Sequence, residues 1–295
     1  MQSAYLSGCK RIITTKHNIM YGETQRSGGL RLPPTLIIAL VMAGFTLFKY
    51  YANSSVNEVT GEKQHISMSV EQEIAMGLQS APQMMAEMGG EVEGTTYDAK
   101  VREVGAKLVS SSDALRTDYK DHFNFHLLAD DRTINAFALP GGQIFITAAL
   151  LQRLTSDGRS LDEDMLAGVL GHEIGHVVAR HSAEKLAQME LAQGLTGAVS
   201  MATYDPSNPS GSYIAQAVAN MLQLKYGRGQ ELQSDELGVR FMLQSGYEPE
   251  KLVDVMEILK QASGGSRVPE FQSSHPDPEN RKEKILEAIK KYRGQ

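Results

Sequence analysis

The residues with the clearest chemical potential are His172, Glu173 and His176, which form an H-E-x-x-H pattern within Leu166–His181. On an α-helix, positions four apart share one face and lie about 6 Å apart along the axis. Two imidazoles at this spacing can bind one zinc ion, and the glutamate between them then lies beside the open side of the ion. The pattern therefore predicts one Zn²⁺ per chain, with both histidines as ligands and Glu173 as the catalytic base.

The surrounding sequence favours this interpretation over a helix that carries two structural histidines. A capping-box signature, Ser160-x-x-Glu163, precedes the pattern, and no proline interrupts the periodic segment as far as Ala192. We therefore expect one long helix to hold the pattern.

A zinc hydrolase needs a third protein ligand and an open position for water. Glu231 and Asp235 lie four apart at the start of a second helical pattern, which runs to Ser245 and is closed by Gly246. On one helix face they could serve as a carboxylate ligand and as a carboxylate that accepts a proton from a liganding imidazole. A solvated helix face is the alternative, and the upstream H-E-x-x-H pattern makes it the weaker one. We predict Glu231 as the third ligand and Asp235 as the carboxylate that orients a liganding imidazole.

His181 lies five residues after His176, about 140° round a helix, so an unbroken helix cannot bring it to the same ion. We interpret it as a packing or hydrogen-bonding residue and leave it out of the site.

Composition excludes several other classes of protein. The chain of 295 residues has a net charge of −6, no tryptophan and no basic block in its body, so nothing indicates a nucleic-acid surface. Its one cysteine, Cys9, rules out an internal disulfide framework and a cysteine-based zinc site. The sequence leaves the role of Cys9 and the oligomeric state open.

The N-terminal part predicts a membrane anchor. Residues 1–31 carry five basic residues against one acid, and the apolar segment 32–51 is close to the roughly 20 residues that span a bilayer. The positive-inside rule places residues 1–31 in the cytoplasm and the rest of the chain outside, with 32–51 as an uncleaved transmembrane signal anchor. A buried core helix, a cleaved segment and a mitochondrial transit peptide are the alternatives.

The remaining chain divides into a polar linker, 52–68, and one domain, 69–295. Helices are expected from Ser69 to about Met88, at 97–110, at 249–262 and in a charged segment ending near Tyr292. Phe123, Phe125 and Leu127 alternate as in a strand, and Asn135–Thr147 reads as two short strands about a Pro140-Gly-Gly turn. The fold class is therefore α+β, mainly helical with a small sheet.

Proline within the 135–147 run suggests a sheet edge. An edge strand at Asn135, Ala136 and Phe137, beside the zinc helix, could pair with an extended substrate peptide; a packed hairpin is the alternative. Residues 193–224, between the two metal-bearing helices, could form a lid over the cleft or a plain surface loop.

Four motifs occur together, in this order along the chain: the Asn135-Ala-Phe…Pro-Gly-Gly segment, H-E-I-G-H-V-V-A-R-H, Y-G-R-G-Q-E-L-Q-S-D and Ser-His275-Pro…Arg281. This set resembles the membrane-associated zinc metallopeptidases of peptidase family 48, over about residues 69–290. A single anchor resembles the bacterial Oma-like members. One departure is Ser234, where the family usually has alanine before the aspartate, which bears on local packing.

The resemblance implies a gluzincin-type domain with His172, His176 and Glu231 as zinc ligands, Glu173 as the base and Asp235 behind the ligands. It also implies that His275 approaches the metal, either to stabilise the transition state or to occupy the fourth position in a resting form. Tyr226 is a second candidate for stabilising the oxyanion.

The function expected from these features is a membrane-anchored zinc endopeptidase that acts on misfolded or unassembled membrane or envelope proteins. The alternative is a zinc-stabilised, chaperone-like binding module in which His275 closes the metal site. The expected location is the bacterial inner membrane with a periplasmic catalytic domain, or else the mitochondrial inner membrane. Expected partners are polypeptides and the lipid bilayer.

Overall fold

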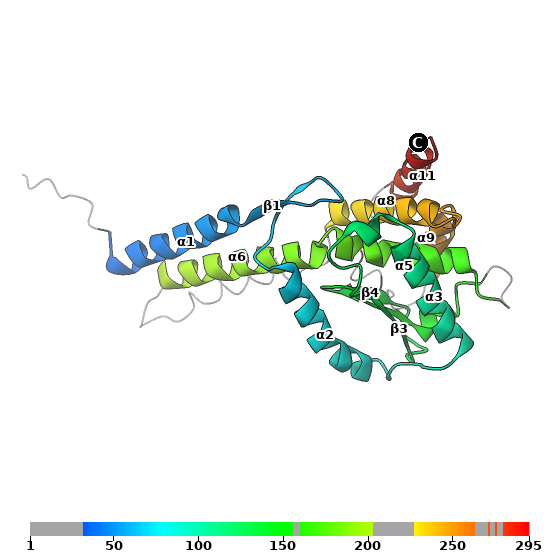
Figure 1. Ribbon diagram of the computed structural model, residues 1–295. Helices are drawn as coiled ribbons and strands as arrows, with labels where there is room; N and C mark the ends of the chain where they lie inside the picture. Colours follow the sequence, from blue (N-terminus) through cyan, green and yellow to red (C-terminus); the bar gives the residue numbers. More distant parts are fainter. Residues whose placement is uncertain are drawn as a thin grey trace, which may run out of the picture. The chain divides into compact units, whose positions relative to one another are not determined.

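The helix that carries the H-E-x-x-H pattern, α5 (Glu163–Val178), lies among the other elements of the fold (Figure 1). The computed structural model describes residues 32–155, 160–202, 227–262, 271, 275 and 280–294. Every residue of α5 from Met165 to Val178 is buried. A helix buried on all sides must be apolar or internally hydrogen-bonded throughout, so any polar side chain on α5 needs a specific partner.

The helix α5 begins two residues later than the sequence pattern suggested. Asp162 is its N-cap, and the Asp162 side chain accepts a hydrogen bond from Met165 N at 3.0 Å. The negative charge of aspartate at this position also interacts favourably with the positive end of the helix dipole. The capping box predicted from Ser160 is therefore wrong.

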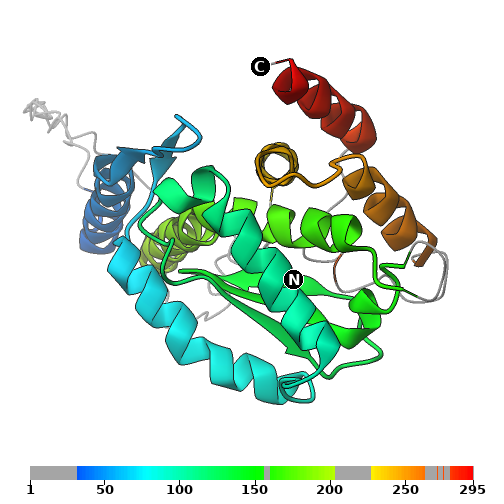
Figure 2. The same ribbon diagram turned by 45° about the vertical axis from the view of Figure 1, so that its right-hand side comes forward.

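Helices pack on both sides of α5 (Figure 2). They are α3 (Thr96–Ser110), α8 (Arg228–Gln244) and α9 (Lys251–Ala262), and α11 (Arg281–Arg293) packs on α8 and α9. The helix α2 (Val70–Glu87) begins at the predicted Ser69 capping box, in which Ser69 and Gln72 exchange hydrogen bonds. The predicted helices after residue 69 are confirmed to within two residues at their starts, with short additional turns at η1 (Asp113–Arg116) and α4 (Ala148–Leu151).

The sheet has three strands, β3 (Asn124–Leu128), β4 (Ala136–Leu139) and β5 (Gln143–Thr147), in the order β3-β5-β4. The strand β5 pairs parallel with β3 and antiparallel with β4. Gly141 and Gly142 turn the chain with φ of 78° and 104°, which glycine adopts without a steric penalty. The predicted pair of strands about Pro140 and the edge position of β4 are confirmed, as is the α+β class.

Small residues let α8 approach α5 closely. An added Cβ at Gly171 would lie 3.4 Å from Gly238 Cα, and one at Gly175 would lie 2.9 Å from Ser234 O. Ser234, the residue that departs from the family pattern, is fully buried and donates a hydrogen bond to His172 O at 2.8 Å. Its hydroxyl is thereby satisfied, and the substitution leaves the packing intact.

The N-terminal helix α1 (Pro34–Ala52) leads into a hairpin of β1 (Ser54–Val56) and β2 (Lys63–His65). This hairpin occupies the stretch expected to be a linker. Asn57 Nδ2 donates to Val178 O at 2.9 Å, and Gln64 Nε2 donates to Ala179 O at 2.5 Å. Both carbonyls lie at the C-terminal end of α5, where backbone acceptors lack partners within the helix. The hairpin therefore caps α5.

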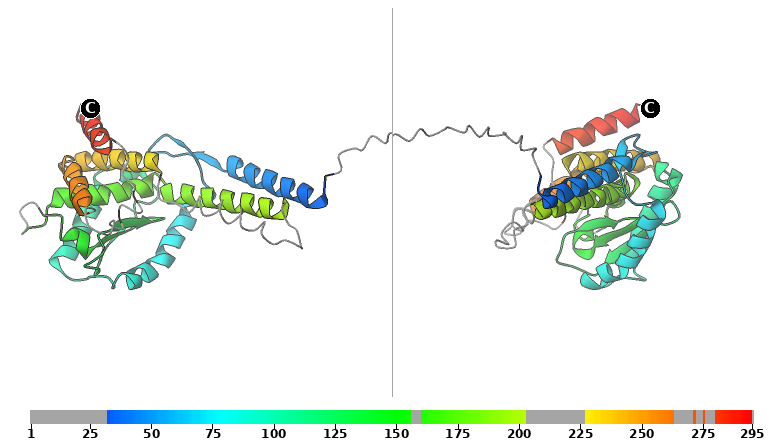
Figure 3. Two further views of the ribbon diagram at one scale, coloured as in Figure 1. Left: turned by 180° about the vertical axis from the view of Figure 1, so that it is seen from behind. Right: turned by 90° about the vertical axis from the view of Figure 1, so that its left-hand side faces the viewer.

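The expected single helix through Ala192 is instead two helices, because Arg180 has φ of 57°. Arg180 Nε donates to Glu73 Oε1 at 2.9 Å and its Nη2 donates to Met68 O at 3.0 Å. A non-glycine residue keeps this backbone conformation only when its surroundings hold it there. After the break, α6 (His181–Ala202) runs beside α1, as Figures 1 and 3 both show. Residues 193–202 are thus helical, and the rest of the predicted lid lies outside the described residues.

Candidate metal centre

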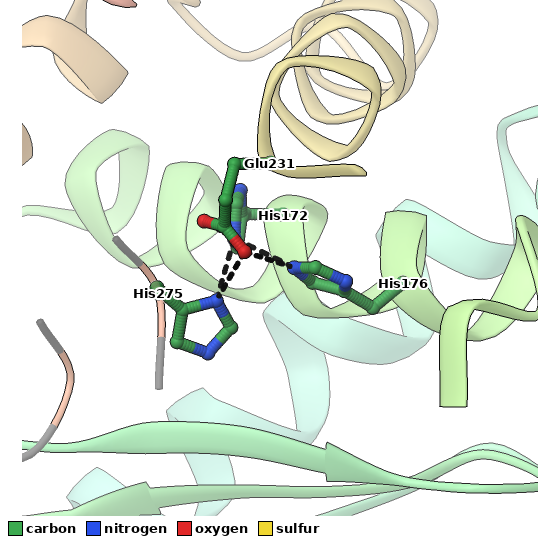
Figure 4. Close-up of side chains that lie close together, drawn as sticks. All are labelled: His172, His176, Glu231 and His275. Atoms are coloured by element: carbon green, nitrogen blue, oxygen red, sulfur yellow. Dashed lines mark hydrogen bonds and ion pairs between the residues drawn. The ribbon is translucent and has the colours of Figure 1, made fainter. Parts of the chain in front are cut away.

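Four buried side chains converge between α5, α8 and the chain segment that precedes α11 (Figure 4). His172 and His176 come from α5, Glu231 from the first turn of α8, and His275 from the later segment. One potential ligand atom from each of these residues lies within 4.8 Å of the other three. All four residues are at most 1% exposed. The structure therefore brings together the three predicted ligands and also His275.

The spacing of these atoms fits ligands of one ion. Zinc–nitrogen distances of 2.0–2.1 Å place neighbouring tetrahedral ligand atoms about 3.3 Å apart. His172 Nε2 lies 3.0 Å from His176 Nε2 and 3.3 Å from His275 Nδ1. Glu231 Oε1 lies 3.4 Å from His176 Nε2 and 3.1 Å from His275 Nδ1. Imidazole nitrogens that face one another at such distances point to a common cation as their partner.

Asp235 and Arg281 lie directly behind His172. His172 Nδ1 donates to Asp235 Oδ1 at 2.8 Å, which leaves Nε2 to face the cluster. Arg281 Nε donates to Asp235 Oδ2 at 2.7 Å, and its Nη2 donates to Oδ1 at 2.9 Å. The Arg281 guanidinium also lies 3.6 Å from Glu231 Oε2. One arginine thus holds the carboxylates of Glu231 and Asp235 in place.

His176 has a corresponding support in His181. His181 Nδ1 lies 2.9 Å from His176 Nδ1, and His181 Nε2 lies 2.7 Å from Gln233 Oε1. If Gln233 Oε1 accepts from His181 Nε2, then His181 Nδ1 is an acceptor and His176 Nδ1 is its donor. His176 Nε2 is then free of a proton and can bind a metal. The prediction that His181 is a hydrogen-bonding residue is confirmed, but its partner is a predicted ligand.

Glu173 lies beside the cluster with no exposed surface. Among the residues that the structure describes, neither oxygen of its carboxylate has a hydrogen-bond donor, and Glu173 Oε1 is 3.6 Å from His275 Nε2. Burial raises the pKa of Glu173 above its ordinary value. A buried carboxylate without a donor, adjacent to a cation site, is suited to take up a proton.

The electrostatics of the cluster favour a cation. Burial opposes a charge on His172, but hydrogen bonds to Asp235 and Glu231 raise the pKa of His172 to about 9. Burial keeps the pKa of His176 well below its ordinary value and lowers that of His181 to about 4. Despite burial, the hydrogen bonds of three histidines hold the pKa of Glu231 below its usual range. The centre therefore stabilises positive charge beside the ionised carboxylate of Glu231, while burial disfavours the charged forms of His176 and His181.

The predicted substrate strand lies on the edge of the sheet, in β4 and just before it. Asn135 is buried and exchanges hydrogen bonds with Thr147, Ala136 pairs with Ile146, and Phe137 stacks on Phe145 at 4.8 Å between ring centroids. The strand contacts α5. Its pairing with a substrate stays a prediction.

Sequence reasoning missed the roles of Arg281 and Gln233, and it did not identify His176 as the hydrogen-bond partner of His181. Arg281 belongs to the fourth motif, and its position six residues after His275 was the only sign in the sequence that it lies near the site. Gln233 offered no signal, because its role depends on the break at Arg180. Tyr226 and Cys9 lie outside the described residues.

The chain is similar to known peptidases. The profile described as Peptidase family M48 matches residues 96–289, more than half of the chain. The beta-barrel assembly-enhancing protease of Yersinia pestis is 29% identical over 232 residues, which are 75% of this chain and 44% of that protein. Its namesake in Escherichia coli (strain K12) is 30% identical over 188 residues, 61% of this chain and 36% of that protein.

A eukaryotic relative is similar over a greater share of both chains. The mitochondrial metalloendopeptidase OMA1 of Schizosaccharomyces pombe is 28% identical over 254 residues, 85% of this chain and 71% of that protein. The chain spans less than half the length of the two bacterial relatives. Since the matched profile includes α5, α8 and most of α11, the chain belongs to peptidase family M48.

Proposed function

We propose that this protein is a membrane-anchored zinc endopeptidase. The observation that carries the proposal is the buried cluster of His172, His176, Glu231 and His275, with the carboxylate of Glu173 beside it, to which no described residue donates a hydrogen bond. The donor set of imidazole and carboxylate suits zinc, and the distances fit one ion. Two histidines and one glutamate are also the protein ligands of known catalytic zinc sites.

The residues of the chain divide the chemistry among them. When bound, zinc supplies a Lewis acid that makes water acidic near neutral pH. Glu173 accepts the proton of the attacking water, and its raised pKa lets it return that proton to the leaving amine. Asp235 and His181 hold the two imidazoles in the tautomer with Nε2 toward the centre. The edge strand β4 would hold the substrate extended beside α5.

The test is cleavage of an unfolded protein by the full-length chain in detergent. We expect casein cleavage that a chelator abolishes and that about one equivalent of zinc per chain restores. Chelator-resistant cleavage would rule out the metal mechanism, and zinc binding without cleavage under any condition would favour the binding-module alternative.

His275 has a specific place in this proposal, because its Nδ1 takes the fourth corner of the cluster. A catalytic zinc site needs that corner for water. We infer that His275 closes the centre in this conformation and must withdraw for turnover. The alternative, that His275 stabilises the transition state, requires it to stay near the centre during catalysis.

His275→Ala distinguishes these roles. If His275 closes the centre, the variant should cleave casein several-fold faster than the wild type at saturating zinc, because water gains the fourth position. It should also bind zinc about 10-fold or more weakly, since one ligand is lost. Initial rates and competition with a chelator measure the two effects. A large loss of kcat with zinc bound would assign the transition-state role instead.

His181 offers a prediction about metal binding that does not depend on catalysis. His181→Phe keeps most of the buried volume and removes the acceptor for His176 Nδ1. We expect zinc affinity to fall by about 10–100-fold. His181→Gln keeps an acceptor and should retain most of the affinity. Equal losses in both variants, or none, would show that His181 only fills space.

The membrane attachment rests on α1, the one described helix that is long and apolar enough to cross a bilayer. Its side chains Val41, Phe45 and Phe48 are 66%, 67% and 70% exposed, as lipid-facing residues would be. We propose residues 1–31 as a cytoplasmic segment, 32–51 as the anchor and 69–295 as the peptidase domain. We propose the bacterial inner membrane as the location, with the mitochondrial inner membrane as the alternative; one relative is bacterial and another is named as mitochondrial.

The orientation and the substrates are also part of the proposal. The basic N-terminal segment favours a periplasmic domain, and misfolded or unassembled membrane proteins are the proposed substrates. A reporter fused after Gln295 should be active only outside the cytoplasm. Reporter activity in the cytoplasm would overturn the orientation without affecting the zinc chemistry.

A further inference from the structure

The charged residues of the helix α6 are confined to its first half. Its first half carries Glu184, Lys185 and Glu190, whereas Leu191–Ala202 contains no charged residue. In a water-exposed helix, charge would be expected to continue on the outer face. The uncharged half lies beside α1, the proposed membrane anchor.

Three contacts fix which parts of the two helices lie at the same level. Lys49 Nζ is 2.9 Å from Glu190 Oε2. An added Cβ at Gly194 would lie 2.5 Å from Thr46 Cγ2, and one at Gly197 would lie 3.6 Å from Met42 Cε. Residue numbers rise along α6 as they fall along α1, so the helices are antiparallel.

Glycine at position 194 therefore permits a close approach of the two helices. Small residues allow this kind of packing between helices in lipid, where apolar burial gives no driving force. Thr46 at the same contact donates its hydroxyl to Met42 O at 2.8 Å, so it leaves no unsatisfied polar group toward lipid. These features are those of two helices that share a bilayer.

The ion pair between Lys49 and Glu190 marks where that bilayer would begin. Beyond it, α1 runs towards Pro34 and α6 towards Ala202 with no further charged residue in either helix. Tyr50 and Tyr51 follow Lys49 in the chain and lie on the other side of the ion pair from these uncharged segments. Tyr50 stacks on His65 at 4.6 Å between ring centroids. Tyrosines and lysines gather at membrane–water interfaces.

We propose that Leu191–Ala202 of α6 lies within the lipid bilayer beside α1, so that two antiparallel helices enter the membrane. This rests on the proposed anchoring by α1. If α1 is in the bilayer, any segment packed on it at Thr46 and Met42 must lie at the same depth. Twelve residues at 1.5 Å each reach about 18 Å, more than half of the roughly 30 Å hydrocarbon core.

The same geometry sets the distance between the metal centre and the membrane surface. His181 contacts the His176 ring and lies nine residues before Glu190 on the same helix, or about 14 Å along its axis. The hairpin β1–β2, which follows α1, caps α5 at Val178 and Ala179. The peptidase centre is therefore held close to the membrane surface, which favours substrate segments near that surface.

The test uses single cysteines in the full-length chain, with the natural Cys9 replaced by serine. An environment-sensitive fluorophore is attached at Val199→Cys, which lies in the uncharged half of α6 and is 37% exposed. Gln188→Cys, exposed on the charged half, is the water control, and Phe45→Cys on α1 is the lipid control. Labelled proteins are reconstituted in phosphatidylcholine vesicles with or without bromine on the acyl chains.

We expect the Val199→Cys label to behave like the Phe45→Cys label, with several-fold stronger quenching by brominated lipid than at Gln188→Cys and little quenching by aqueous iodide. Ala202→Cys serves as a second position if Val199→Cys does not fold. Quenching at Val199→Cys and Ala202→Cys by iodide but not by brominated lipid, with Phe45→Cys in lipid, would overturn this inference and leave the anchor intact. Iodide quenching at Phe45→Cys as well would overturn the anchor itself.

Discussion

Glu173→Gln should lower kcat for casein by about 10²–10⁴-fold, because it removes the general base and keeps the shape of the side chain. Glu173 is fully buried, and no described residue donates a hydrogen bond to its carboxylate, so the amide replaces no existing bond. It also removes a buried charge, which leaves the fold no less stable. Zinc content should therefore stay at one ion per chain while turnover is lost.

Glu163→Gln is the matched control, since this glutamate lies in the first turn of the same helix with a 45% exposed side chain. Its ion pair with Lys100 is at the surface and contributes little. Steady-state rates and metal analysis on both variants make the comparison. Wild-type cleavage by the Glu173→Gln protein would show that another group acts as the base.

Arg281→Met should destabilise the full-length protein by about 3–5 kcal/mol, because it leaves a buried carboxylate without its cation. Arg281 is 5% exposed and Asp235 is 1% exposed, and the guanidinium donates two hydrogen bonds to Asp235. Burial raises the pKa of Asp235, but the charges and hydrogen bonds of Arg281 and His172 together hold this pKa below its ordinary value. Denaturant unfolding in detergent measures the change in the free energy of unfolding.

Two further variants separate buried charge from general damage. Arg116→Met removes an arginine whose side chain is 79% exposed and should cost less than about 1 kcal/mol. Asp235→Asn combined with Arg281→Met removes both charges and keeps an acceptor for His172, so it should regain most of the lost stability. A double variant no more stable than Arg281→Met alone would show that the ion pair is not the cause.

The parts of this site that could be predicted from sequence are those in which the interacting residues lie a few positions apart in the chain. Residues four apart on a helix share a face, so the pairing of His172 with His176 and of Glu231 with Asp235 followed from spacing alone. The Ser69 capping box and the glycine turn after Pro140 are also local, and both occur as expected. The resemblance to a known family added His275, which spacing could not reach.

The parts that could not be predicted depend on contacts between distant segments. The break at Arg180 places a non-glycine residue at positive φ, and its cause is an ion pair with Glu73, 107 residues earlier. That break allows His181 to contact His176, which an unbroken helix would forbid. The cap that Asn57 provides to α5 spans 121 residues. None of these contacts leaves a periodic or motif signal in the sequence.

The central claim is that His172, His176, Glu231 and His275 surround one zinc ion, and zinc X-ray absorption of the full-length protein tests it most directly. For the wild type we expect three imidazoles and one carboxylate oxygen at about 2.0–2.1 Å. In His275→Ala we expect two imidazoles, with an additional light oxygen ligand from water. A site without stoichiometric zinc, or one that has the same number of imidazoles in both proteins, would contradict the account.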